Sequence, residues 1–231
     1  MADPSLNLLA VETSTDLCSV ALRAGERLHV DEARIPNRHA ERLEPMARAL
    51  LGEAGLVPSD LDGFAFGQGP GSFTGIRIGC GFIQGLAFAL DRPVIPVPSL
   101  EALAQASGAA RVATALDARM GEAYFAAYES GPDGWIARIA PCLVAPGEIP
   151  PLPGTGWWSA GSGFEAFDWL RDACAASLAG HCSSIVPGAG AVAKLAAVRL
   201  GRGEGIRAED AAPLYLRDKV ARTVAERQAG P

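Results

Sequence analysis

A glycine- and proline-rich turn followed by a long apolar run constrains this sequence more than any other stretch. Residues 67–75 read GQGPGSFTG, and the run that follows is predicted to form a helix over Gly75–Leu90. Glycine and proline favour a tight turn, and a hydroxyl side chain within it can cap the helix. Arg77 and Gln84 are the polar residues of this helix, and their seven-residue spacing places them on one narrow stripe. Nearly all of the remaining helix surface must therefore be covered.

Small residues at four-residue intervals give this helix two smooth ridges. One ridge carries Gly75 and Gly79, and the other carries Gly81, Gly85 and Ala89. Each interior glycine costs roughly 1 kcal/mol relative to alanine, which close packing against another backbone can offset. Two interpretations remain open: the helix is covered inside its own domain, or one face docks onto a second protein. Its length, below the ~20 residues of a membrane span, argues against a transmembrane helix.

Composition restricts the classes of function. The 231 residues suit one or two globular domains, with 49% hydrophobic and 20% charged residues. A net charge of -6 argues against a protein that binds nucleic acid alone, so a partner should supply the basic surface if RNA is involved. Five cysteines without a Cys-x-x-Cys pair indicate neither a disulfide framework nor a zinc knuckle. The first residues show no basic and apolar signal pattern, so we expect a cytoplasmic protein with no membrane partner.

The order of predicted elements in the first 104 residues indicates a ribonuclease-H-like α/β domain. Three sequential strands followed by helix-linked strands are typical of that fold. Pro45 lies within the first predicted helix, so the regular helix should begin near Glu44 or bend there. The predicted elements are strands over 6–11, 18–22 and 28–35, a helix over 38–55, a strand over 62–67, the helix over 75–90 and a strand over 94–97.

The second half, residues 105–231, is predicted to be a reduced copy of the first. Its first strand ends in Asp117 as the first strand of the chain ends in Glu12. Residues 144–154 hold four prolines where a helix is due, so no helix is expected there. A charged tail from Arg217 to the end is expected to be solvated. The other predicted elements are strands over 111–116, 123–128, 135–139, 157–160 and 184–186, and helices over 164–176 and 189–200.

Fragments of a phosphate-binding site follow the first strand of each half. The turn Glu12-Thr13-Ser14-Thr15-Asp16 carries two carboxylates and three hydroxyls, which can hold a phosphate or a divalent cation. The same residues are also ordinary turn formers. Weak ATP or ADP binding is left open, whereas turnover is disfavoured because residues 116–121 hold a single glycine. The candidate nucleotide-binding residues are Glu12, Thr13, Ser14, Asp16, Asp117, Gly161 and Gly163.

Four segments resemble the TsaB family, also called YeaZ. They are ETS at 12–14, GPGSFTGIRIG at 69–79, LDARMGEAY at 116–124 and PLYLR at 213–217. The resemblance runs through most of the chain in a preserved order. It implies an actin-like ATPase fold of two ribonuclease-H-like domains. It also implies a role in bacterial synthesis of threonylcarbamoyladenosine, the modified base beside the anticodon of certain tRNAs.

Within this resemblance, the chain is similar to a non-catalytic relative of TsaD, the subunit that transfers the threonylcarbamoyl group. TsaD places two metal-ligand histidines four residues apart, a spacing that brings side chains to one helix face. The matching positions here are Ser99 and Leu103, and TsaD's Asp-Glu pair becomes Asp16-Leu17. A leucine cannot ligate a metal, so the resemblance implies no metal site, no required cofactor and a degenerate, non-catalytic paralogue.

The resemblance also implies partners. The helices over 38–55 and 75–90 are expected to join TsaD in a heterodimer, or a second copy of the chain when TsaD is absent. The chain would help to recruit TsaE and meet tRNA only through the complex. The implied interface residues are His39, Leu43, Met46, Leu50, Gly75, Arg77, Gly79, Phe82 and Ile83.

The alternative is an autonomous ATP-dependent enzyme or peptidase of the actin-like superfamily. A serine hydrolase built on Ser72 and His39 has less support, because the serine lacks the nucleophile-elbow spacing.

Overall fold

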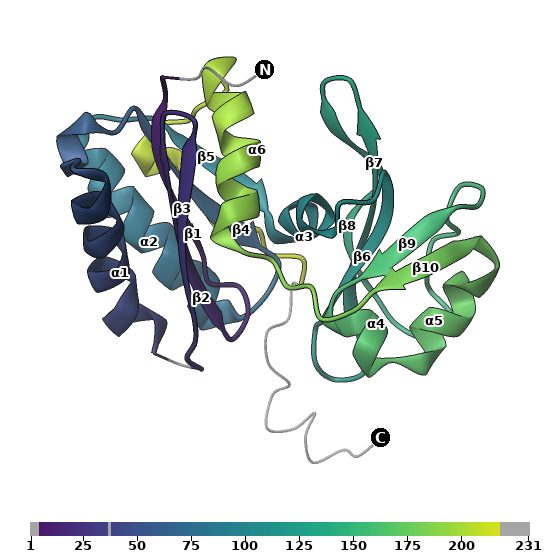
Figure 1. Ribbon diagram of the computed structural model, residues 1–231. Helices are drawn as coiled ribbons and strands as arrows, with labels where there is room; N and C mark the ends of the chain where they lie inside the picture. The colour runs from purple at the N-terminus through teal and green to yellow at the C-terminus, as the bar shows by residue number, and fades with distance from the viewer. Residues whose placement is uncertain (1–4, 37, 218–231) are drawn as a thin grey trace, which may run out of the picture.

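Two five-stranded mixed sheets form the framework of the protein (Figure 1). The computed structural model describes residues 5–36 and 38–217, so the predicted tail lies outside the described residues from 218 onward. The first sheet has the order β3-β2-β1-β4-β5 and the second β10-β9-β6-β7-β8. The strands of the first sheet are β1 (Asn7–Glu12), β2 (Leu17–Ala24), β3 (Arg27–Arg34), β4 (Gly63–Gly69) and β5 (Val94–Pro98). Those of the second are β6 (Arg111–Asp117), β7 (Ala123–Gly131), β8 (Gly134–Val144), β9 (Trp157–Ala160) and β10 (Leu178–Cys182).

The two sheets repeat one topology, which confirms the predicted duplication. In each, the first three strands pair antiparallel. The fourth strand then pairs parallel with the first, and the fifth pairs parallel with the fourth. This is the ribonuclease-H-like order, and its presence twice is the actin-like ATPase arrangement.

Helices cover both faces of the first sheet. On one face lie α1 (His39–Ala54) and α2 (Phe73–Leu90), which pack with the inward side chains of β1, β2 and β4. The α1 helix runs through Pro45 instead of starting near Glu44. Pro45 lies on the exposed side of α1, while Leu43, Met46 and Leu50 are buried against the sheet. The packed side therefore keeps α1 helical from His39 onward, although Pro45 has no N–H to donate within the helix.

The helix that follows each sheet packs against the other sheet. The α3 helix (Ser99–Ser107) follows β5, but Leu100 and Leu103 pack with the strands of the second sheet. The α6 helix (Ala189–Gly201) follows the second sheet, yet Val192 and Ala196 pack on β1, β2 and β4 (Figure 1). The predicted division after residue 104 had placed this last helix in the second domain. The structure places it in the core of the first sheet, because its alanine-rich face fits closely over the small residues of β1 and β2.

The second sheet has lost the counterpart of α1. The proline-rich connection from β8 to β9 contains no helix, as predicted. The predicted helix over 164–176 is divided at Phe167 into α4 (Ser162–Ala166) and α5 (Asp168–Cys174). The strand expected over 184–186 is wrong: the fifth strand is β10, where Gly180 leaves room for the Trp158 ring. Within residues 5–36 and 38–217, the fold is completed by three short 3-10 helices, Pro58–Asp60, Ala175–Ser177 and Ala208–Asp210.

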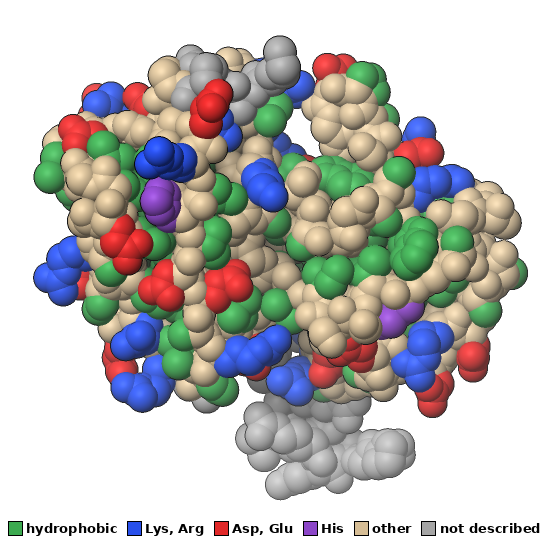
Figure 2. Space-filling model, viewed as in Figure 1, with side chains coloured by type: hydrophobic (Ala, Val, Ile, Leu, Met, Phe, Trp, Pro, Cys, Tyr) green, Lys and Arg blue, Asp and Glu red, His purple; other side chains and the backbone are tan. Residues whose placement is uncertain are grey.

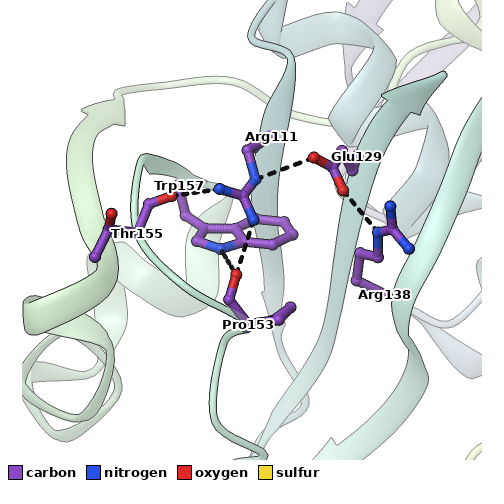
Figure 3. A network of polar contacts seen from close by, with 6 residues as sticks. All are labelled: Arg111, Glu129, Arg138, Pro153, Thr155 and Trp157. Carbon is purple, nitrogen blue, oxygen red and sulfur yellow. Dashed lines mark hydrogen bonds and ion pairs between the residues drawn. The ribbon is translucent and has the colours of Figure 1, made fainter.

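Arg111, at the start of β6, fastens this proline-rich connection to the sheet (Figure 3). Its guanidinium carbon lies 4.6 Å from the centre of the Trp157 ring. The same group donates to the carbonyl oxygens of Pro153 at 2.8 Å and Thr155 at 2.5 Å, and pairs with Glu129 at 3.4 Å. One side chain thus replaces part of the packing that a helix would supply.

Candidate functional site

The turn after β1 is closed around the buried carboxylate of Glu12. This residue is 0% exposed. Its Oε1 accepts a hydrogen bond from the Ser14 backbone N–H at 2.7 Å, and its Oε2 accepts one from the Ser99 hydroxyl at 2.8 Å. The Ser99 hydroxyl in turn accepts the Gly69 N–H at 3.2 Å. Glu12 and Ser99 therefore join β1, β4 and α3 at the turn that the sequence predicts as a phosphate or cation site.

Burial dominates the electrostatics of this carboxylate. It raises the pKa of Glu12 above its ordinary value, although the hydrogen bonds from Ser14 and Ser99 act in the opposite direction. The side chain also lies against the backbone of β4, because a Cβ atom at Gly67 would be 1.9 Å from Glu12 Oε2. Gly67 is therefore required by the carboxylate.

The remaining turn residues pack on the N-terminus of α2. The Thr13 hydroxyl donates to the Gly75 carbonyl oxygen at 2.8 Å. Cβ atoms added at Gly75 and Gly79 would lie 2.0 Å from the Thr13 carbonyl oxygen and 2.5 Å from its hydroxyl. Ser72 caps the helix, since its hydroxyl accepts the Gly75 N–H at 3.2 Å. The Gly75 and Gly79 ridge therefore faces the turn after β1 instead of a partner.

The other candidate nucleotide residues form no single open site in the described residues. Asp16 is exposed and pairs with Arg34 at 3.2 Å. Asp117 accepts the Arg119 N–H at 2.7 Å. Gly161 and Gly163 are used in packing, because Cβ atoms there would lie 2.3 Å from the Ala115 carbonyl oxygen and 2.8 Å from its Cβ.

The two positions at which the sequence resemblance implies lost metal ligands are occupied by packed side chains. Ser99 and Leu103 are both 0% exposed. Leu103 belongs to the core between α3 and the second sheet, with Val112 and Leu116, and its Cδ2 would lie 2.5 Å from a Cβ at Gly161. In the part of the chain that the structure describes, no group of three or more His, Cys, Asp or Glu side chains could hold a metal ion.

A C-terminal strap, residues 206–217, covers the polar stripe of α2. Gln84 Nε2 donates to the Ala208 carbonyl oxygen at 2.9 Å, and Arg77 Nε donates to the Tyr215 hydroxyl at 2.7 Å. The strap then crosses to the turn between β6 and β7, where Arg217 donates to the Ala118 carbonyl oxygen at 3.1 Å. Sequence reasoning missed this strap, although two polar side chains seven residues apart on an apolar helix indicated a specific line of contact.

The second glycine ridge of α2 is open. Cβ atoms added at Gly81 and Gly85 would meet nothing within 4 Å. Phe88, on the same side, is 71% exposed. With 18 residues, α2 is longer than the predicted helix over 75–90 and is apolar enough to cross a membrane by length and composition, but its inner side packs on the first sheet. The structure thus divides α2 into a core ridge, a stripe under the strap and an exposed apolar face.

Most of the predicted interface residues are buried within the chain itself. Arg77 is exposed and Phe82 is half-buried. His39 is buried, with its Nε2 2.8 Å from the Thr15 carbonyl oxygen. The other predicted residues are also buried, namely Leu43, Met46, Leu50, Gly75, Gly79 and Ile83.

A groove of about 680 Å³ lies between α3, α6 and the β7–β8 hairpin. Glu101 and Arg199 line this groove and form an ion pair at 2.5 Å. Trp135 also lines it, and its indole N–H donates a hydrogen bond to the Gln105 side-chain oxygen. Acidic and basic side chains are interspersed on the face shown in Figure 2, so that face presents no broad basic surface.

The chain is similar to proteins of tRNA threonylcarbamoyladenosine synthesis. The family of tRNA N6-adenosine threonylcarbamoyltransferases, TsaD, matches residues 34–223. The chain is 34% identical to the tRNA threonylcarbamoyladenosine biosynthesis protein TsaB of Escherichia coli, over 94% of this chain and 96% of that protein. It is 49% identical to TsaB of Haemophilus influenzae over 52% of this chain and 53% of that protein.

The structural relatives agree. YeaZ from Pseudomonas aeruginosa superposes with a TM-score of 0.85 at 41% identity, covering 91% of this chain and all of that one. A second structure, an uncharacterized protein with similarity to the peptidase YeaZ from the same species, gives the same score over 92% of this chain. The chain therefore belongs to the TsaB (YeaZ) family, whose named members act in tRNA threonylcarbamoyladenosine biosynthesis.

Proposed function

We propose that this protein is a non-catalytic subunit of the threonylcarbamoyladenosine modification complex. In this role it pairs with TsaD, helps to recruit TsaE and meets tRNA only through the complex, in the cytoplasm. Its relatives' names support the pathway. The proposed role requires no cofactor of its own.

The observation that carries the proposal is the use of Ser99 and Leu103 in packing. Ser99 closes the Glu12 turn, and Leu103 fills the space beside Gly161. Restoring two histidines there would remove a buried hydroxyl bridge and a buried leucine at once. Selection for a stable scaffold explains both residues, whereas selection for metal chemistry explains neither.

The exposed face of α2 supports the partner role. Apolar side chains and bare glycine backbone remain uncovered along the helix, and such a surface normally marks an interface. TsaD is the proposed occupant. A second copy would use the same face about a two-fold axis when TsaD is absent.

The test is reconstitution of tRNA modification from TsaD, TsaE and threonylcarbamoyl-adenylate. We expect modification to depend on this chain. The Ser72→Ala variant should support modification as wild type does, because the Ser72 hydroxyl only caps α2. Full modification without the chain would refute the proposal.

One comparison favours the peptidase alternative, since a structural relative is described as similar to a peptidase. The geometry of this chain opposes it. The Ser72 hydroxyl caps α2, and the His39 ring is bonded to the Thr15 carbonyl oxygen. Ser159 does lie 2.9 Å from His181, but Ser159 is only 2% exposed and out of reach of a peptide. ATP hydrolysis by the isolated chain that disappears in Asp117→Ala would support the enzyme alternative instead.

A further inference from the structure

The guanidinium of Arg77 lies against two aromatic rings at the surface. Its guanidinium carbon lies 3.4 Å from the centre of the Phe73 ring and 5.3 Å from that of Tyr215. The two ring centres are 6.0 Å apart, with an angle of 43° between the ring planes. Phe73 comes from the first turn of α2, whereas Tyr215 comes from the C-terminal strap. The guanidinium therefore sits where two distant parts of the chain meet.

The orientation of this guanidinium leaves its two terminal nitrogens without a hydrogen-bond partner among the described residues. Its Nε donates to the Tyr215 hydroxyl at 2.7 Å. Among the described residues, no carboxylate pairs with Arg77. Phe73 is 40% exposed and Tyr215 46% exposed, so solvent reaches the stack. A guanidinium fixed in this way loses little side-chain entropy when it binds two parallel oxygens.

The charge around Arg77 favours an anion. Arg77 is the sole charged residue of α2. It lies near the helix N-terminus, where the macrodipole is positive. The complementary group is a carboxylate, which matches the fork of the guanidinium.

The neighbouring surface favours a protein as the source of that carboxylate. Gly81 and Phe88 follow Arg77 by four and eleven residues, on the same side of α2. Gly81 is open to a partner and Phe88 is 71% exposed. An arginine and aromatic rings beside an open apolar stripe are the composition of a protein-binding hot spot. A chain with a net charge of -6 is a poor match for an RNA backbone.

We propose that the Phe73–Arg77–Tyr215 stack is a preformed clamp for a carboxylate side chain of the partner protein that docks on α2. This inference rests on the proposed function and deepens it. The C-terminal strap becomes part of the docking surface through Tyr215, so α2 alone does not make the site.

The test measures the dissociation constant for the cognate TsaD by calorimetry. Arg77→Ala should weaken binding tenfold or more. Arg77→Lys should recover little of this loss, because an ammonium group cannot form the two parallel bonds. Tyr215→Phe should weaken binding by a few fold through loss of the Nε acceptor. Arg27→Ala is the matched control, since Arg27 is an exposed arginine on β3, at the far edge of the sheet, and should bind like wild type.

Further measurements distinguish a loss of folding from a loss of the clamp. Thermal midpoints of Arg77→Lys and Tyr215→Phe show whether the strap stays docked. If TsaD binds all variants equally, the clamp is refuted while the proposed function stands. If wild type does not bind TsaD, the proposed function fails. The clamp is then judged by arginine side-chain NMR of the isolated chain during titration with sodium acetate.

Arg77 should respond in that titration before Arg27, and equal responses would overturn the inference. Loss of tRNA binding in Arg77→Ala with TsaD binding intact would also overturn it, in favour of a nucleic-acid contact.

Discussion

Alanine substitutions on the two glycine ridges of α2 should change stability in opposite directions. At Gly81 an added Cβ meets nothing within 4 Å. Gly81→Ala should therefore raise the free energy of unfolding by about 1 kcal/mol, the difference in helix propensity. At Gly79 the same atom would lie 2.5 Å from the Thr13 hydroxyl, which is itself bonded to the Gly75 carbonyl oxygen.

Two effects lower the free energy of unfolding in Gly79→Ala. Overpacking costs about 1–3 kcal/mol, and displacing the Thr13 hydroxyl removes a buried hydrogen bond of about 1 kcal/mol. After the propensity gain of about 1 kcal/mol, Gly79→Ala should be destabilised by about 1–3 kcal/mol. The two variants should thus differ by about 2–4 kcal/mol, although both make the same chemical change in one helix.

Urea unfolding followed by circular dichroism measures this difference. The dependence of free energy on urea should be the same in both variants, so that the midpoints report stability alone. A stabilised Gly79→Ala variant would refute the placement of this ridge against Thr13. A destabilised Gly81→Ala variant would show that the second ridge is covered by the chain itself.

Three further predictions follow from the buried groups. Burial raises the pKa of Glu12, so the free energy of unfolding of wild type should fall as the pH rises from 4.5 through the pKa of Glu12 in the folded state. The Glu12→Gln variant should lack this decrease. If the two proteins show the same dependence of stability on pH, the pKa shift is contradicted. Leu103→Ala should lose about 2–5 kcal/mol in urea unfolding because a fully buried leucine leaves a cavity beside Gly161, whereas a loss below about 1 kcal/mol would mean that the site collapses. Burial raises the pKa of the Cys18 and Cys174 thiols to about 11, so neither should react with iodoacetamide at neutral pH until the chain unfolds, and rapid labelling of the native protein would contradict this.

The sequence alone predicted most of the elements in their correct order, although no helix was predicted over Ser99–Ser107, where α3 lies. The strand over 157–160 and the absence of a helix over 144–154 were both predicted as the structure has them. The duplicated strand order also followed from the sequence, because hydrophobic runs and prolines act on their own stretch of chain. Motif residues in the right order led to the family. Errors arose where a strand was short, as at β10, whose five residues include Gly180 and no β-branched, Phe, Tyr or Trp side chain that would indicate a strand.

The sequence also identified the residues of the candidate site, but not their use. The acid Glu12 and the substituted positions Ser99 and Leu103 were singled out separately. The structure joins the first two through a 2.8 Å hydrogen bond and turns the third toward Gly161. No local pattern contains this information, because the partners are 87 residues apart in one case and 58 in the other.

Coverage of α2 was likewise decided by tertiary structure. An apolar helix with two glycine ridges was evident from the sequence, which therefore required close neighbours on nearly every side. Which neighbour takes which face depends on contacts across the whole chain: the turn after β1 takes Gly79, the C-terminal strap takes Arg77 and Gln84, and Gly81 is left open. The spacing of apolar residues along a helix indicates how much of its surface must be buried, because that spacing is a property of one element. The identity of the covering surface is a long-range property, and only the fold determines it.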